Sequence, residues 1–323
     1  MEDPAMSKKL KALLKRPEGN TLIFLLAICI LMSILSPVFL TSRNILTVLR
    51  QISTIAICAV GMSYVIICGG IDLSQGRMIG FAAVLGAYFG AEAKMNWGPL
   101  PALLIMLLVP ACFGLINGLM VTRIGLPPFI ATLGMQRVVY GLALLICNAS
   151  PIRYDQTWIT VFGGGMVGNI PASIFVMLVI LVLGFLVSKY TVYGRNVYII
   201  GNSEKAALLS GINVKNVKLF PYIFSSLLAA VSGLVLLGQM VAADASYGDG
   251  TELDAIASAV IGGVSMTGGE GNILGVILGA AVLGIIKNAF VLLMIPAYWQ
   301  TIVIGLVIIA SVTLDCMRKK LSK

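Results

Sequence analysis

Long apolar runs separated by short polar segments dominate this chain. A helix that crosses the hydrocarbon core of a bilayer needs about 20 mainly apolar residues. The strands of a membrane barrel would instead alternate between apolar and polar positions, whereas Thr21–Ile34 and Ile174–Val187 are continuously apolar. The pattern therefore predicts spanning helices over residues 21–40, 45–68, 76–92, 100–121, 128–147, 171–188, 218–242, 272–294 and 298–315.

One further apolar piece, Asp254–Met266, is short for a span, because its 13 residues would extend only about 20 Å as a helix. Charge indicates how to count it, since Lys and Arg concentrate in cytoplasmic loops. If the piece crosses, the basic N-terminus, the polar insert 189–218 and the basic tail 316–323 all lie on the inner side. We therefore predict an all-α polytopic membrane protein with about ten transmembrane helices, short broken spans and both termini cytoplasmic.

Two glycine-rich segments interrupt the apolar pattern. Gly69–Gly76 follows the second predicted span, and Gly262–Gly271 follows the short piece. Irregular backbone at membrane depth is tolerated where it is buried in protein or lines a cavity, and broken spans are frequent in transporters. Gly76 and Gly80 lie 195 residues before Gly271 and Gly275. This spacing suggests two structurally parallel halves, with independent glycine turns between packed helices as the alternative.

Composition agrees with a membrane protein and excludes several kinds of chemistry. The chain is 59% apolar and 11% charged, with a mean hydropathy of +1.01. It has no histidine, so zinc sites and acid–base chemistry built on histidine are excluded. It also lacks a G-x-x-x-x-G-K-[ST] phosphate loop. We therefore expect no enzyme active site, cofactor or metal in this chain, and three parts: a cytoplasmic segment 1–20, a transmembrane domain 21–315 and a cytoplasmic tail 316–323.

The polar insert contains a candidate docking helix for a soluble cytoplasmic partner. Residues 204–211 can form about two helical turns, because Asn202 or Ser203 suits an N-cap and Gly211 suits a C-terminal stop. Two successive alanines make this helix slim enough to enter a groove. The candidate coupling residues are Asn202, Glu204, Ala206, Ala207 and Gly211.

Small uncharged polar residues within the spans are candidates for the transport pathway. Amides can donate and accept hydrogen bonds, as can hydroxyls, which suits polyhydroxylated solutes. Lys287 is included because ionisable groups within spans are costly and often functional. The candidate pathway residues are Gln51, Asp72, Ser74, Asn117, Phe129, Thr132, Lys287 and Asn288.

The predicted outer loop before the short piece gathers acids. Asp244, Asp249, Glu252 and Asp254 lie within eleven residues. They form either an ordinary solvated loop or a docking surface for a basic patch on an external partner.

Several motifs together resemble a known family. Gly70–Ser74, Pro128–Gly134, Ser210–Val214 and Glu252–Ala257 look like motifs of the ribose-type branch of the monosaccharide ABC importer permeases, in the branched-chain amino acid/ribose permease superfamily. The resemblance runs from about Thr21 to Asp315.

The resemblance implies a bacterial inner-membrane permease subunit. Its partners would be a second permease copy or paralogue, a cytoplasmic ABC ATPase that holds ATP and Mg, and a periplasmic or lipid-anchored sugar-binding protein. Membrane lipids surround it, and no nucleic acid is expected. Two positions depart from the family pattern: Ile200 replaces a usual Gly, and Lys287 stands where Asn is common.

The function that we predict is alternating-access import of a monosaccharide, ribose or a related small sugar, driven by the separate ATPase. The first alternative is an ABC permease for another small solute, such as a branched-chain amino acid, a nucleoside or a signalling furanose. The second is a secondary transporter that needs no ATPase. Acidic residues within spans, which ion-coupled transporters usually show, are scarce in this sequence.

Overall fold

The structure is a computed structural model that describes residues 17–154 and 157–321 of the 323-residue chain. Residues 1–16 of the predicted N-terminal segment and residues 322–323 of the tail lie outside the described residues. The helices are α2 (Pro17–Leu35), α3 (Ser42–Ile67), α4 (Gln75–Gly90), α5 (Pro99–Leu119), η1 (Met120–Ile124), α6 (Pro128–Cys147), α7 (Thr157–Gly163), α8 (Ala172–Tyr190), α9 (Val192–Asn202), α10 (Glu204–Leu209), α11 (Val214–Met240), α12 (Thr251–Ile261), α13 (Ile273–Leu292) and α14 (Ala297–Leu321). Two antiparallel pairs of two-residue strands complete the fold: β1 (Ile152–Arg153) with β4 (Ala242–Ala243), and β2 (Met166–Val167) with β3 (Ile170–Pro171).

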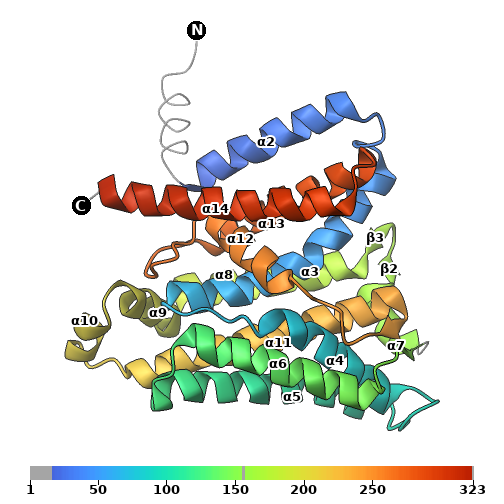
Figure 1. Cartoon of the computed structure of the whole chain (residues 1–323), viewed down its shortest axis with the longest axis horizontal. Helices are drawn as coiled ribbons and strands as arrows, with labels where there is room; N and C mark the ends of the chain where they lie inside the picture. Colours follow the sequence, from blue (N-terminus) through green and yellow to red (C-terminus); the bar gives the residue numbers. More distant parts are fainter. Residues whose placement is uncertain (1–16, 155–156, 322–323) are drawn as a thin grey trace.

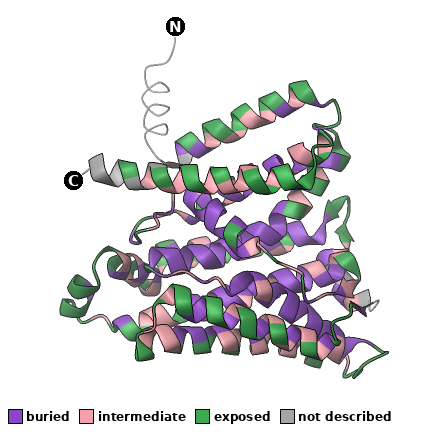
Figure 2. Ribbon diagram, in the orientation of Figure 1, coloured by how far each residue is buried: buried purple, intermediate pink, exposed green. Residues whose placement is uncertain are grey.

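The long helices run roughly along one direction and enclose α3 and α11 (Figure 1). Helix α11 packs against α3, α4 and α5, while α13 packs against α3, α12 and α2. Figure 2 shows buried residues concentrated in this centre and exposed residues along α2, α14, α5 and α6. The exposed side chains are strongly apolar, such as Ile34 (77% exposed) and Leu145 (77% exposed), which is the surface expected of a protein whose solvent is lipid.

Six described helical segments are long and apolar enough to cross a membrane: Ser42–Ile67, Pro99–Ile124, Pro128–Cys147, Ala172–Tyr190, Val214–Met240 and Ile273–Leu292. Two shorter apolar stretches lie within α2 and α14. The predicted all-α polytopic class is therefore confirmed. Helices α4 and α12, with 16 and 11 residues, are shorter than a full span.

The first turns of α4 and α12 lie against each other, and both are largely buried. Gly76 of α4 packs against Gly248 and Glu252, and a Cβ on Gly76 would lie 2.6 Å from the Gly248 carbonyl oxygen. One turn further along α4, a Cβ on Gly80 would lie 2.7 Å from the Ala245 carbonyl oxygen. The missing side chains thus let the segment before α12 enter the bundle and reach α4. Helices α4 and α12 are thus short helices that adjoin irregular segments, and their place in broken spans stays a prediction.

The short piece departs from its predicted extent. Helix α12 starts three residues earlier than expected and stops at Ile261 rather than Met266. It stops there because the next two residues are glycines and Gly263 has a φ of +91°, which a helix cannot continue through. Residues 262–272 therefore form an irregular segment that leads to the start of α13.

The polar insert and the ends of the described chain share one side of the molecule. The start of α2 and the end of α14 lie toward the same end of the bundle as α9 and α10 (Figure 1). The opposite end carries α7 and the β2–β3 pair. This arrangement brings the basic insert and the basic end of α14 to a common face.

Candidate functional site

The predicted docking helix exists as α10, with Ser203 rather than Asn202 as its N-cap. The Ser203 Oγ accepts a hydrogen bond from the Ala206 N–H at 3.2 Å. Gly211 follows the helix with a φ of +78°, the left-handed conformation that favours glycine. The Lys218 ammonium donates to the Glu204 carboxylate at 3.1 Å, which ties α10 to the first turn of α11. The functional role of these residues stays a prediction.

Helix α10 exposes two leucines beside its charged residues, which the sequence reasoning missed. Ala207 is fully buried, whereas Leu208 is 60% exposed and Leu209 is 91% exposed. Adjacent exposed leucines on a short helix at the tip of the molecule are available to a protein partner. The signal was present in the sequence, because two leucines end an otherwise polar stretch.

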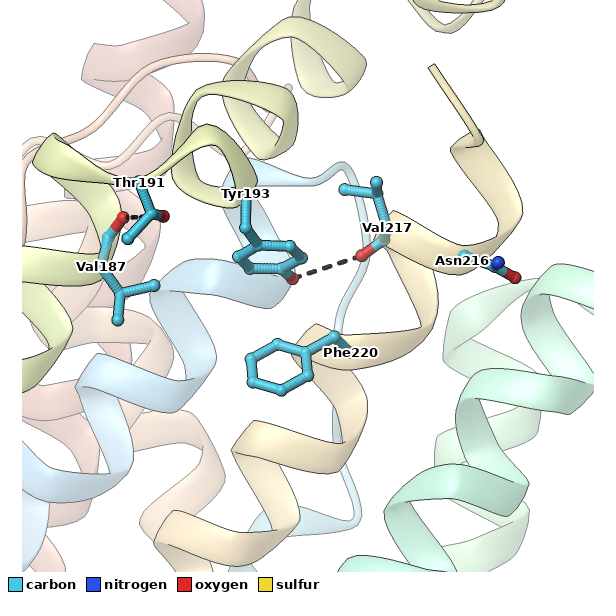
Figure 3. Close-up of a pocket in the computed structure, with 6 residues that line it drawn as sticks. All are labelled: Val187, Thr191, Tyr193, Asn216, Val217 and Phe220. Carbon is cyan, nitrogen blue, oxygen red and sulfur yellow. Dashed lines mark hydrogen bonds between the residues drawn. The ribbon is translucent and has the colours of Figure 1, made fainter. Parts of the chain in front are cut away.

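A groove lies between α9, the end of α8 and the start of α11. Its volume is about 420 Å³, and Figure 3 shows Tyr193 of α9 standing between the end of α8 and the start of α11. The Tyr193 hydroxyl donates to the Val217 carbonyl oxygen at 3.2 Å, and Phe220 packs against the Tyr193 ring. The lining residues are Val187, Thr191, Tyr193, Asn216, Val217 and Phe220. Tyr193 thus joins α9 to the start of α11 on this side.

The other side of α9 joins both glycine-rich segments in what we term the glycine junction, made of Ile67–Gly69, Gly201–Asn202 and Gly268–Gly271. The Asn202 amide donates to the Gly269 carbonyl oxygen at 3.2 Å, and the Gly269 N–H donates to the Ile67 carbonyl oxygen at 2.9 Å. Gly201 lies so close to the Ile67 carbonyl oxygen that a Cβ would overlap it. Close backbone contacts therefore connect α9 to the end of α3 and to the segment between α12 and α13.

Tyr198 adds a second hydrogen bond from α9 to this junction. Its hydroxyl donates to the Gly271 carbonyl oxygen at 3.0 Å. Burial raises the pKa of Tyr198, so the hydroxyl keeps its proton and remains a donor across the physiological pH range.

Four of the eight predicted pathway residues surround the segment between α3 and α4. The Ser74 hydroxyl donates to the Asp72 carboxylate at 2.6 Å and accepts from the Asn117 amide at 2.9 Å. The Thr132 hydroxyl lies 3.3 Å from the Ile71 carbonyl oxygen. Asp72, Ser74, Asn117 and Thr132 are all fully buried. The network fastens this irregular segment to α5 and α6, so these four side chains support the broken span.

The other four predicted pathway residues lie elsewhere. Gln51 and Phe129 are exposed on α3 and α6. The Asn288 amide exchanges hydrogen bonds with Asn44 at 2.9 and 3.1 Å, which joins α13 to α3. Lys287 forms an ion pair with Asp254 of α12. The polar groups of Lys287 and Asn288 are thus engaged in helix–helix contacts, and the pathway role of all eight residues stays a prediction.

The predicted docking surface needs a correction at two of its four acids. Glu252 and Asp254 are 6% and 8% exposed, so neither can meet an external protein. The segment before α12 enters the bundle, and it carries Glu252 to α4 and α6 and Asp254 to Lys287. Asp244 and Asp249 precede these positions in the chain, and their docking role stays a prediction.

Sequence reasoning missed a polar cluster where α4, α6 and α12 meet. The Arg77 guanidinium pairs with Asp249 at 2.7 Å and lies 4.2 Å above the Tyr140 ring. Beside it, the Gln136 amide donates to Glu252 Oε1 at 2.9 Å. We name these five residues the half-helix cluster. One signal could have found it, because Gln136 and Tyr140 are four residues apart and share a face of the predicted helix.

An all-helical membrane bundle with two broken spans and a helix pair projecting from one end defines a membrane transport component. The chain belongs to the family described as branched-chain amino acid transport system / permease component, whose model matches residues 44–312.

Curated relatives match nearly the whole chain. The chain is 38% identical over 298 residues to the ribose import permease protein of Bacillus subtilis strain 168, covering 92% of this chain and 91% of that protein. It is 35% identical over 305 residues to the ribose import permease protein of Escherichia coli K12, covering 92% and 93%. It is 34% identical over 306 residues to the D-allose transport system permease protein of the same strain, covering 94% and 92%. No solved structure matches the chain significantly.

Proposed function

We propose that this chain is the membrane-spanning permease subunit of an ABC importer for a monosaccharide, ribose or a related small sugar. The observation that carries the proposal is the glycine junction, through which the projecting α9–α10 unit contacts both interrupted spans. A permease driven by a separate motor needs such a link, because the motor can act only on elements that it touches.

The sugar assignment rests on the relatives. Proteins named as ribose and D-allose permeases align with more than nine tenths of this chain. The permease itself needs only weak contacts with its cargo, because a translocation site must release what it binds. Selectivity among sugars then resides largely in an external binding protein.

The partners follow from the same assignment. A cytoplasmic ABC ATPase holds ATP and Mg and receives α10 through Glu204, Ala206 and Gly211, with Leu208 and Leu209 as its apolar contact. The buried Ala207 packs α10 against the permease, and Asn202 joins the glycine junction. A second permease copy or paralogue completes the membrane part, and a sugar-binding protein delivers cargo from outside, with Asp244 among its contacts.

The topology that we propose has ten crossings of the bacterial inner membrane, with both termini in the cytoplasm. In this arrangement α4 and α12, each with its adjoining irregular segment, complete one crossing apiece. Support comes from charge, since the basic insert and the basic end of α14 lie at one end of the bundle.

Co-purification tests the coupling role of α10. The tagged permease is expressed with its genomically neighbouring ATPase, and wild type is compared with Leu209→Ser, Glu204→Ala and Leu306→Ser. Leu306 is 60% exposed on α14 and serves as the matched control. We expect the α10 variants to retain less ATPase while remaining folded in the membrane. If Leu209→Ser and Glu204→Ala both retain as much ATPase as the wild type, docking through α10 is refuted.

Two other functions make different predictions. An ABC permease for branched-chain amino acids would co-purify with the same kind of ATPase, but its binding protein would take leucine rather than ribose. A secondary transporter would take up cargo when reconstituted alone with an ion gradient. The ligand bound by the co-purified external protein decides between the first alternative and the sugar importer.

A further inference from the structure

The half-helix cluster contains Arg77, Gln136, Tyr140, Asp249 and Glu252. Its accessibility and its unused hydrogen-bonding groups are properties of a binding site rather than of a packing contact. The Asp249 side chain is 62% exposed and that of Arg77 is 12% exposed. Gln136 and Tyr140 are half-buried. The cluster therefore remains partly accessible, although it lies within a bundle of otherwise apolar spans.

Its hydrogen-bonding capacity is incompletely used. Glu252 is 6% exposed, and its Oε2 atom has no hydrogen-bond partner among the described residues. This oxygen points to the first turn of α4, where it lies against Gly76. A buried carboxylate oxygen without a donor is costly, so an opening of the contact between Glu252 and Gly76 that admits a donor from a ligand gains free energy.

The position of the cluster also favours a transport role. It stands where the N-termini of α4 and α12 meet, and the ends of broken helices are where transporters commonly hold their cargo. Ionisable groups at membrane depth are expensive and usually mark a pathway. Arg77, Asp249 and Glu252 together carry one positive and two negative charges, so the cluster disfavours anionic cargo.

We infer that the half-helix cluster is the contact site for the sugar as it passes through the permease; this inference rests on the proposed function. The Arg77 guanidinium supplies fixed donors, the Asp249 and Glu252 carboxylates supply fixed acceptors, and the Gln136 amide supplies both. Neighbouring hydroxyls of a neutral monosaccharide donate and accept in the same pattern. Hydrogen bonds to charged groups are stronger than those between neutral groups. A few such contacts are therefore enough to hold the sugar during its passage. Tyr140 orients the guanidinium by stacking beneath it.

The test uses the complete complex in proteoliposomes, with its partner ATPase inside and its binding protein outside, and radiolabelled ribose as the probe. We expect Arg77→Gln and Glu252→Gln each to lower initial uptake about tenfold or more, since each removes charge-assisted hydrogen bonds. ATP hydrolysis stimulated by the binding protein should persist. Arg123→Gln is the matched control, because Arg123 bonds Asn216 far from the cluster.

A charge-reversed pair separates a substrate contact from a structural ion pair. Arg77→Asp combined with Asp249→Arg restores the attraction but exchanges donors and acceptors. We expect this double variant to recover the thermal stability of the wild type without its uptake. Recovery of uptake would show that the pair is only structural and would overturn the inference.

The outcomes also distinguish this inference from the proposed function. Normal ribose uptake by the wild type, together with normal uptake by Arg77→Gln and Glu252→Gln, overturns the cluster assignment alone. Failure of the assembled wild type to import ribose, with uptake of leucine instead, overturns both.

Discussion

At the scale of single residues, the ion pair between Lys287 and Asp254 explains how a lysine is tolerated among apolar helices. The two side chains are 24% and 12% exposed, and they join α13 to α12 within the bundle. A lone lysine at this depth would be costly. The nearby carboxylate therefore lets this chain carry Lys287 within α13.

We expect Asp254→Asn to destabilise the protein, because it leaves the Lys287 charge without its partner. Breaking a buried ion pair costs about 3–5 kcal/mol, and the partial exposure here favours the lower end. Adding Lys287→Asn should recover most of the loss, since no charge then remains. Thermal unfolding in detergent measures both, and equal Tm values for the single and double variants would contradict the account.

Gly201 offers a second test at this scale. A methyl group there would overlap the Ile67 carbonyl oxygen, so Gly201→Ala should open the glycine junction. Overpacking of this kind typically costs about 1–3 kcal/mol. Gly134→Ala in α6 is the control, because no atom lies within 4 Å of its added Cβ and alanine favours a helix. A Tm for Gly201→Ala as high as that of Gly134→Ala would argue against close packing at the junction.

At the scale of elements, the turn after α10 determines how the docking helix is presented. Gly211 has a φ of +78° with open space around it, so substitution there strains the backbone without steric overlap. We expect Gly211→Val to lower both ATPase retention and coupled ATP hydrolysis. Gly211→Asn should be mild, because asparagine tolerates the left-handed conformation. Equal effects of the two variants would show that backbone strain is not the cause.

Most elements of this fold could be predicted from the sequence, since apolar run length directly reports membrane helices. The predicted helix 128–147 coincides with α6, and the docking helix begins at Glu204 as its capping residues indicate. The contacts between elements could not be predicted. Nothing in the local pattern near Glu252 indicates that this segment enters the bundle, because that depends on Gly76 and Gly80, far away in the chain.

The candidate site was harder to predict than the helices for the same reason. Polarity within a span selected Asp72, Ser74 and Asn117, and the structure does bring these three together. Polarity cannot distinguish a side chain that braces a loop from one that contacts cargo. Arg77 pairs with Asp249 of the segment before α12, and nothing in the sequence around either residue indicates that the two meet.

At the scale of the whole molecule, the two ends of the bundle differ in character. One end carries α9, α10 and the ends of the described chain, and the other carries α7 and the β2–β3 pair. Positive charge at the first end predicts that it faces the cytoplasm.

Fusion reporters test this orientation. A fluorescent protein fused after Lys323 should fold and fluoresce, because it remains in the cytoplasm. Alkaline phosphatase fused after Gly168, in the turn between β2 and β3, should be active because that turn faces the periplasm. The reverse pair of results would invert the topology.

Uptake by the reconstituted complex tests the central claim most directly. Proteoliposomes containing the permease and its ATPase, with ATP inside and the sugar-binding protein outside, should accumulate radiolabelled ribose. Accumulation should stop when either ATP or the binding protein is omitted. Accumulation by the permease alone, driven by an ion gradient without ATP, would contradict the assignment as the permease subunit of an ATP-driven importer.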